Sequence, residues 1–152
     1  MLKHLSINNY AIIERLEIDF NKGFTAITGE TGAGKSILLG ALSLILGQRA
    51  DKTVLNNKDK KCIVEGEFEI ELERFSHFFE TNELDFEQPN IIRREINSKG
   101  KSRAFINDTP INLSVLKDLT SQLIDIHSQH ETLNIQSDKF QLSVIDAFAK
   151  NV

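Results

Sequence analysis

Alternating hydrophobic and polar positions mark several short stretches of the chain as half-buried β-strands. The alternation covers residues 5–7, 16–20 and 64–70, the last with a row of glutamates on its polar side. Two more strands within 92–106 flank the polar turn 97–101 and predict a β-hairpin.

A second pattern, apolar on nearly every side, covers residues 37–46 and predicts a buried helix. Gly47 follows it as a natural C-terminal cap, because glycine adopts the left-handed conformation that ends many helices. Residues 24–28, just before a glycine-rich stretch, predict a short strand. Leucines at helical spacing predict another helix near 113–119, and a short apolar strand is expected at 123–126.

The stretch between the strand at 24–28 and the apolar helix reads GETGAGKS and fits the phosphate-binding pattern G-x-x-x-x-G-K-[ST] in full. Its glycines let successive backbone N–H groups converge on one anion, which the positive end of the following helix also attracts. Lys35 is expected to bind the β- and γ-phosphates, and Ser36 to offer its hydroxyl to Mg²⁺. The predicted nucleotide-binding residues are Gly29, Glu30, Thr31, Gly32, Ala33, Gly34, Lys35 and Ser36.

Hydrolysis of a nucleotide requires more than this loop, namely a carboxylate near the metal and a residue that positions water. The carboxylate usually follows a longer apolar run than the one before Asp125, where Ser121 and Gln122 interrupt the pattern. On the pattern alone, Asp125 stays open as the metal carboxylate of a self-contained P-loop nucleotide-binding protein.

Composition narrows the classes of protein. The chain has 152 residues and a net charge of −4, which excludes a uniformly basic nucleic-acid binder but not a local basic patch. Its single cysteine, Cys62, cannot form an internal disulfide, so a reducing compartment is expected. The longest apolar run, 37–46, is well short of the ~20 residues that cross a bilayer. A cytoplasmic protein with no membrane partner is therefore predicted.

Several further segments carry a family resemblance. The opening residues 5–14 read LSINNYAIIE, GQRAD stands at 47–51, and RREI stands at 93–96. KSRAFIN follows at 101–107 and IDIHSQHE at 124–131. Together with GETGAGKS, this ordered set resembles the RecN family of bacterial DNA double-strand-break repair ATPases, which are related to the SMC proteins.

The resemblance implies an α/β fold, the N-terminal lobe of a P-loop ABC-type ATPase head with an antiparallel β subdomain beside the P-loop strand and helix. Residues 1–152 would form part of this head, incomplete without a C-terminal half, and would end about where a coiled coil begins. The implied cofactors are ATP and Mg²⁺. The implied partners are the C-terminal half of the head, a second head across an ATP-bridged dimer, and DNA. The implied location is the cytoplasm, at the nucleoid during repair.

The resemblance also implies roles for single residues. Lys35 and Gln129 would be catalytic, with Gln129 as the Q-loop glutamine that contacts Mg²⁺ and the attacking water, and Ser36 would be the second metal ligand. Ser128 stands where the family pattern has glycine. The sequence contains no LSGG-type signature, no apolar run ending in Asp-Glu and no switch histidine after such a run. We therefore expect an N-terminal fragment that by itself binds nucleotide without turnover. The head lobe of another SMC-type chromosome-organising or recombination ATPase is the alternative.

A basic cluster has both a functional and a structural interpretation. Lys99, Lys101 and Arg103, with Arg93 and Arg94 alongside, form the densest group of cations in the sequence. Such a group suits the phosphates of DNA, because binding releases the counterions of the backbone. Ordinary solvated surface charge is the structural alternative.

Three smaller features also stay open at this point. Residues 8–10 would contact the base or ribose of a nucleotide, or form a polar turn. Arg49 would reach nucleotide or DNA, or be an exposed residue after the helix. His127 and His130 are close in sequence, but one distant cysteine and no second pair of ligands argue against a zinc site.

Overall fold

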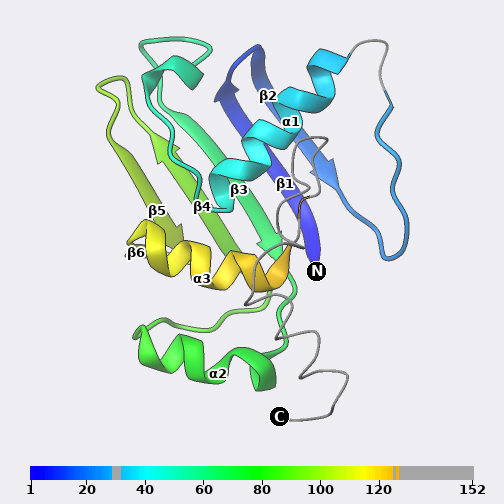
Figure 1. Ribbon diagram of the computed structural model, residues 1–152, viewed down its shortest axis with the longest axis vertical. Coiled ribbons are helices and arrows are strands. Elements are labelled where there is room, and N and C mark those ends of the chain that lie inside the picture. The colour runs from blue at the N-terminus through cyan, green and yellow to red at the C-terminus, as the bar shows by residue number, and fades with distance from the viewer. Residues whose placement is uncertain (29–31, 125, 127–152) are drawn as a thin grey trace, which may run out of the picture.

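The computed structural model describes residues 1–28, 32–124 and 126. Its six strands form one antiparallel sheet in the order β2-β1-β3-β4-β5-β6 (Figure 1). The strands are β1 Leu2–Tyr10, β2 Ile13–Asp19, β3 Cys62–Phe68, β4 Asn90–Ile96, β5 Ser102–Ile106 and β6 Thr109–Ile111. The helices are α1 Gly32–Ile45, α2 Leu72–Thr81 and α3 Leu113–Leu123, with a 3₁₀ turn η1 at Lys52–Val54. None of the described helices is long and apolar enough to span a membrane.

One face of the sheet, here called the inner face, carries the hydrophobic core. Alternate residues of β1, β3 and β4 are buried on it, as the period-two pattern predicts. Two helices cover this face, α1 over β3 and β4 and α3 over β5 (Figure 1). Ala41 and Ile45 of α1 and Leu116 and Leu119 of α3 are fully buried in the core. The second half of α1 is therefore held firmly against the sheet.

The carboxyl end of α1 closes in a Schellman motif, which confirms the cap predicted at Gly47. Gly47 has a φ of +85°, and its N–H donates to the carbonyl oxygen of Leu44 at 3.1 Å. The N–H of Gln48 donates to the carbonyl oxygen of Ser43 at 3.0 Å. A Cβ at Gly47 would lie 2.5 Å from Cγ of Lys117 in α3. Glycine thus both ends the helix and lets the two helices meet.

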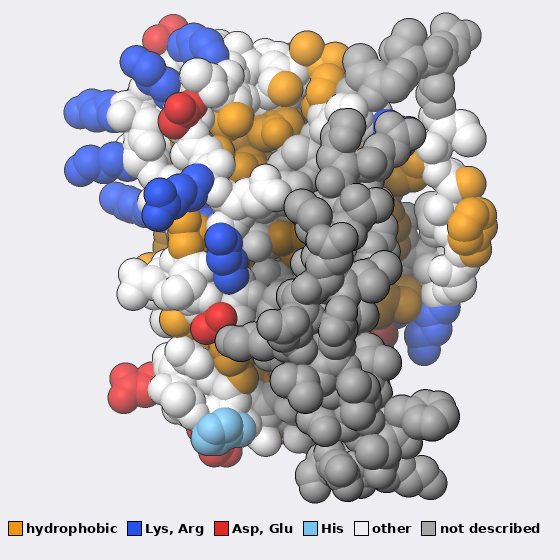
Figure 2. All heavy atoms as spheres, viewed as in Figure 1, with side chains coloured by type: hydrophobic (Ala, Val, Ile, Leu, Met, Phe, Trp, Pro, Cys, Tyr) orange, Lys and Arg blue, Asp and Glu red, His pale blue; other side chains and the backbone are white. Residues whose placement is uncertain are grey.

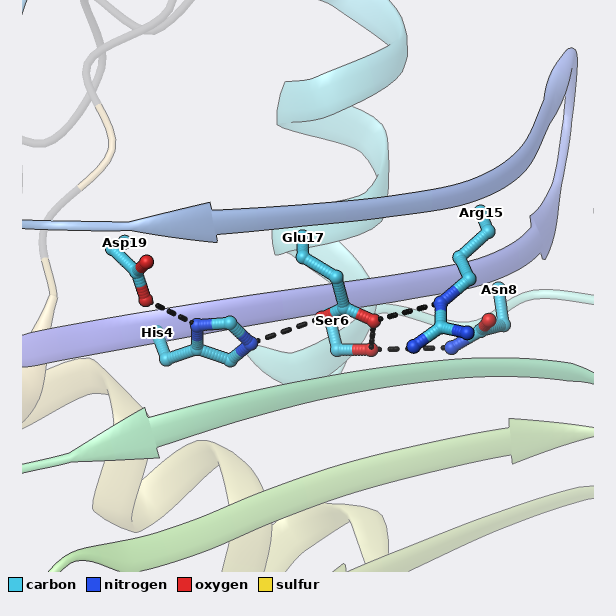
Figure 3. A network of polar contacts seen from close by, with 6 residues as sticks. All are labelled: His4, Ser6, Asn8, Arg15, Glu17 and Asp19. Atoms are coloured by element: carbon cyan, nitrogen blue, oxygen red, sulfur yellow. Dashed lines mark hydrogen bonds and ion pairs between the residues drawn. The ribbon is translucent and has the colours of Figure 1, made fainter.

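The opposite, outer face of the sheet is polar. In β1 and β2, six side chains form a network of hydrogen bonds and ion pairs (Figure 3). The ring of His4 lies between two carboxylates, with Nδ1 2.6 Å from Asp19 Oδ1 and Nε2 2.9 Å from Glu17 Oε2. Ser6 and Arg15 also donate to Glu17, each at 3.2 Å. The two carboxylates of β2 therefore share the ring of His4 as a partner.

The strand expected at 24–28 is not formed. These residues leave the sheet after β2 and run outside it to the start of α1 (Figure 1). Phe24 is 94% exposed and Ile27 is 52% exposed. A strand needs a neighbouring strand to satisfy its backbone N–H and C=O groups, and the described chain places none beside this segment. The prediction is therefore wrong for this structure.

β6 is a strand that the hydrophobic pattern did not predict. Asn107 and Asp108 connect it to β5, and Asn107 has a φ of +53°. Asparagine tolerates a positive φ in turns, so Asn107 was the one local signal in the sequence for this turn. Pro110 lies in β6 at the edge of the sheet, where a missing N–H is tolerated.

The remaining predictions concern residues 75–90, 113–119 and 123–126. The ambiguous segment 75–90 contains most of α2, which buries Phe75 and Phe79 in the core. The helix predicted near 113–119 is confirmed as α3. α3 continues through Leu123, so the described residues of 123–126 do not form the expected strand. Thr120 is buried and Leu123 packs against the core, so the helical pattern continues for one more turn.

Candidate nucleotide-binding site

The amino end of α1 presents the described part of the phosphate-binding motif. Gly34, Lys35 and Ser36 lie in its first turns and are exposed, in contrast to the buried second half of the helix. The first N–H groups of a helix have no partner within it and carry the positive end of its dipole. No acidic residue stands in this first turn to compete for them. This end of α1 is therefore suited to bind an anion.

A cavity of about 630 Å³ lies beside this end of α1. Lys35 and Gly34 line it on one side. Apolar side chains of β2 and of the segment after it form much of the remaining wall, namely Ile13, Leu16, Ile18 and Ile27. Sequence reasoning did not predict this wall, because it depends on how β2 packs against α1. The volume is in the range of small-molecule sites in proteins.

Asn9 and Tyr10 have structural roles. Asn9 is buried, and its side-chain amide donates to the carbonyl oxygens of Asn57 at 3.0 Å and Lys60 at 2.9 Å. Tyr10 is also buried, which raises the pKa of its hydroxyl. A Cβ at Gly40 in α1 would lie 2.5 Å from that hydroxyl oxygen. These contacts are structural, but residues 8–10 lie in β1 and do not form the polar turn that was the alternative to contact with a base.

Other candidate residues lie outside the described part of the chain or are chemically inert. Gly29, Glu30 and Thr31 of the motif lie outside it, as do Asp125 and 127–130, which include Gln129. No group of three or more potential metal ligands occurs among the described residues. Cys62 is fully buried, and burial raises the pKa of its thiol to about 12, so it is no nucleophile.

The predicted basic cluster divides into an exposed part and a part whose arginines are ion-paired or buried. Arg93 lies 3.7 Å from carboxylate oxygens of both Glu65 and Glu95, and its guanidinium stacks 4.7 Å from the ring centre of Phe105. Arg94, its neighbour on the inner face, is 1% exposed. Arg93 is ion-paired and Arg94 is buried, so neither arginine belongs to the exposed part. The alternation of Ile92, Arg94 and Ile96 in the sequence was the signal that Arg94 points inward.

The β4–β5 hairpin and the segment that begins at η1 form the exposed part, here called the basic surface. Its members are the exposed residues Lys52, Lys60, Lys99, Lys101 and Arg103. None of them has an ion pair with a described residue. A Cβ at Gly100 in the β4–β5 turn would lie 3.9 Å from the backbone nitrogen of Lys52, so the hairpin and the segment touch. Figure 2 shows Lys and Arg side chains gathered at this end of the molecule. The structure thus adds two lysines that lie far from the hairpin in sequence.

Comparison with known proteins identifies the family to which the chain belongs. A family model described as an AAA domain matches residues 4–151. The chain belongs to this family. It is 44% identical over 150 residues to the DNA repair protein RecN of Vibrio cholerae serotype O1, covering 98% of this chain and 27% of that protein. For the RecN of Bacillus subtilis (strain 168) the identity is 36% over 151 residues, with 98% and 26% covered. The chain spans about a quarter of the length of these relatives, and the resemblance to RecN is confirmed.

Solved structures confirm the fold. An SMC ATPase studied for its ATP-driven dimerization matches with a TM-score of 0.65 and 24% identity, covering 95% of this chain and 97% of that one. An Smc head domain from Pyrococcus furiosus, bound to the C-terminal domain of ScpA, matches at 0.62 and 25% identity, covering 82% and 33%. The recombination mediator RecF matches at 0.60 and 18%, covering 76% and 29%. The predicted α/β head lobe with an antiparallel β subdomain is therefore correct, apart from the strand at 24–28.

Proposed function

We propose that this chain is the ATP-binding lobe of a RecN-like ATPase that acts in recombinational repair of DNA double-strand breaks. One observation carries the proposal. A complete phosphate-binding motif leads into α1, in a chain related along 98% of its length to a protein named for DNA repair. The cofactors would be ATP and Mg²⁺. A cytoplasmic location, at the nucleoid during repair, fits this function.

In this proposal residues 29–36 surround the phosphates with backbone N–H groups. Lys35 places its charge on the β- and γ-phosphates, and the hydroxyl of Ser36 is a ligand of Mg²⁺. Gln129 is the second protein group at the metal and orients the attacking water. When bound, Mg²⁺ neutralises charge that develops on the transferred phosphate.

The proposed partners complete the head. A C-terminal half would cover the side of the lobe where Phe24 and Ile27 are exposed and where the apolar cavity lies. A second head would face the first across bound ATP and supply the signature sequence. Because these parts supply groups that hydrolysis needs, we propose that residues 1–152 alone bind nucleotide without turnover.

The proposal is tested by the affinity for ATP. Lys35→Ala should weaken the binding of ATP at least about tenfold, because a charged hydrogen-bond donor to the phosphates is lost. Its thermal unfolding should match that of the unmodified chain, since Lys35 is exposed. Lys22→Ala, which removes an exposed lysine elsewhere, is the matched control and should bind ATP normally. Unchanged affinity in Lys35→Ala would refute the proposal.

A second pair of variants separates two assignments of the metal site. Gln129→Ala should reduce the Mg²⁺ dependence of ATP binding, while Asp125→Asn should leave it unchanged. The self-contained P-loop protein that uses Asp125 requires the opposite result. Steady-state phosphate release by the purified chain, dependent on Lys35, would contradict binding without turnover.

We also propose that the basic surface contacts the phosphate backbone of DNA. Its five cations are exposed on the β4–β5 hairpin and on the adjoining segment that begins at η1, although the whole chain carries a net charge of −4. Replacing Lys99, Lys101 and Arg103 by glutamine should weaken binding of a short DNA duplex. It should also reduce the slope of log K against log salt by up to about 3, one for each lost phosphate contact. Glutamines at Lys22 and Lys117, outside this surface, should change neither quantity.

A further inference from the structure

Arg94 is a buried cation with no buried anion beside it. It is the largest fully buried side chain among the described residues, and it is 1% exposed. Its Nη2 donates to Oγ of Ser102 and, at 3.5 Å, to the carbonyl oxygen of Gln48. Its Nε and Nη1 are themselves buried and have no acceptor among the described residues. Both of its partners are neutral and share one nitrogen, so the charge of Arg94 is left without compensation.

A buried arginine without a counter-charge is unfavourable. Arginine stays protonated in proteins, so it cannot escape by releasing its proton. Desolvation lowers the pKa of Arg94, which shows that burial opposes the charged form. Buried charges in native proteins are normally paired or hydrogen-bonded. The contact with Gln48 helps to hold the end of α1, but it does not neutralise the guanidinium.

A cavity of about 370 Å³ lies against Arg94, between β5, β6 and the start of α3. Ser102, Asn112 and Leu113 line it together with Arg94, and none of its lining residues is acidic. α3 begins at Leu113, its N-cap Asn112 makes no side-chain cap hydrogen bond, and its first turn holds no acidic residue. The N–H groups of that turn therefore lack a side-chain cap, and the positive end of the helix dipole faces the same cavity.

We propose that this cavity binds a phosphate group, held by the first-turn amides of α3 and the Ser102 hydroxyl and neutralised by Arg94. A helix N-terminus and a guanidinium are the two groups that proteins use most readily for phosphate. The site is distinct from the phosphate-binding motif, because Arg94 contacts the segment after the far end of α1. It does not depend on nucleotide binding at Lys35. The phosphate could be a free ion or a phosphodiester of nucleic acid on the nearby basic surface.

Calorimetric titration with inorganic phosphate tests the proposal. All variants carry Lys35→Ala, which removes phosphate binding at the motif. In this background phosphate should bind saturably, and Arg94→Met should weaken it at least about tenfold, the loss expected for one charged partner. Arg93→Met is the matched control, since the same residue type lies next to Arg94 on the opposite face, and it should bind normally. No saturable binding, or equal binding by Arg94→Met and Arg93→Met, would overturn the site.

A second measurement keeps the test valid if Arg94→Met fails to fold. Phosphate should shift the amide resonances of Ser114 and Val115 in the NMR spectrum of the Lys35→Ala protein, and Ser102→Ala should raise the phosphate concentration needed. A short DNA duplex then identifies the source. If the duplex abolishes the phosphate-induced shifts, a phosphodiester occupies the site, and if it leaves them intact, the ligand is a free phosphate. Absence of a saturable shift at both amides would refute the proposal.

Discussion

The inner face of the sheet, covered by α1 and α3, and its polar outer face are stabilised in different ways. On the inner face Leu5, Ile7 and Ile92 are fully buried, and helices pack directly on them. On the outer face, the carboxylates that hold His4 are partly open to water, with Glu17 36% and Asp19 88% exposed at the side chain (Figure 3). Ion pairs of this kind contribute little stability, since water screens them.

The comparison shows how the fold positions the candidate site. The inner face holds the second half of α1 through Ala41 and Ile45, while Lys35 at the other end stays exposed. Packing therefore fixes the direction of the helix without burying the end that binds phosphate. Changes on the inner face should alter stability strongly, and changes on the outer face should alter it weakly.

The largest effect is expected when most of a core side chain is removed from the inner face. Ile92→Ala should reduce the free energy of unfolding by about 2–5 kcal/mol, because it leaves a cavity under α1. Ile91→Ala is the matched control on the same strand, with its side chain half-buried on the outer face. It should lose less than half as much. Urea unfolding measures both, and equal losses would show that the two faces do not differ in packing.

A smaller effect is expected at Gly66 of β3, where Ile45 of α1 packs on the sheet. A Cβ at Gly66 would lie 2.8 Å from Cε2 of Phe68 and 2.9 Å from Cδ1 of Ile45, and both of these side chains are fully buried. Gly66→Ala should therefore destabilise the chain by about 1–3 kcal/mol through overpacking. Glu67→Ala, on the outer side of the same strand, should stay within about 0.5 kcal/mol. A stable Gly66→Ala chain would mean that α1 can move away from the sheet.

Local patterns predicted much of this architecture. A period of two places Leu5 and Ile7 on one face whatever the partner strand is, so the alternation identified most strands. The cap at Gly47 and the exposed end of α1 are also local, because each depends on a few consecutive residues. The same alternation places Arg94 inward, although its missing counter-ion needed the three-dimensional contacts.

Features that depend on distant partners could not be predicted. Residues 24–28 have the composition of a strand, but a strand forms only where another lies beside it. Asparagine is common in turns, yet the side-chain amide of Asn9 donates to the carbonyl oxygens of Asn57 and Lys60, about fifty positions later in the chain. The apolar wall beside Lys35 likewise arises from packing of β2 near α1. Sequence patterns specify which face a residue occupies, but not what that face meets.

The smallest effect belongs to the outer face and depends on pH. Hydrogen bonds to Asp19 and then Glu17 raise the pKa of His4 above its ordinary value of 6.5. The hydrogen bond from His4 lowers the pKa of Glu17 below its ordinary value of 4.5. The folded chain holds the proton of His4 more tightly than the unfolded chain, so this contribution is present below pH 6.5. It is lost as the pH rises through the raised pKa. The contribution of Glu17 is present above pH 4.5 and is lost as the pH falls through the lowered value.

NMR titration of the His4 ring tests the direction and cause of its pKa shift. Asp19→Asn should bring the pKa of His4 further back toward 6.5 than Glu17→Gln does, because the bond to Asp19 is the larger cause. Glu14→Gln, an exposed carboxylate in the same strand segment, should leave that pKa unchanged. The stability lost in Asp19→Asn should be greatest on the acid side of the raised pKa and should fade above it, where the ring is neutral in both states. A loss that stayed constant to alkaline pH would mean that Asp19 stabilises the outer face by packing, which its 88% exposed side chain gives no physical reason to expect.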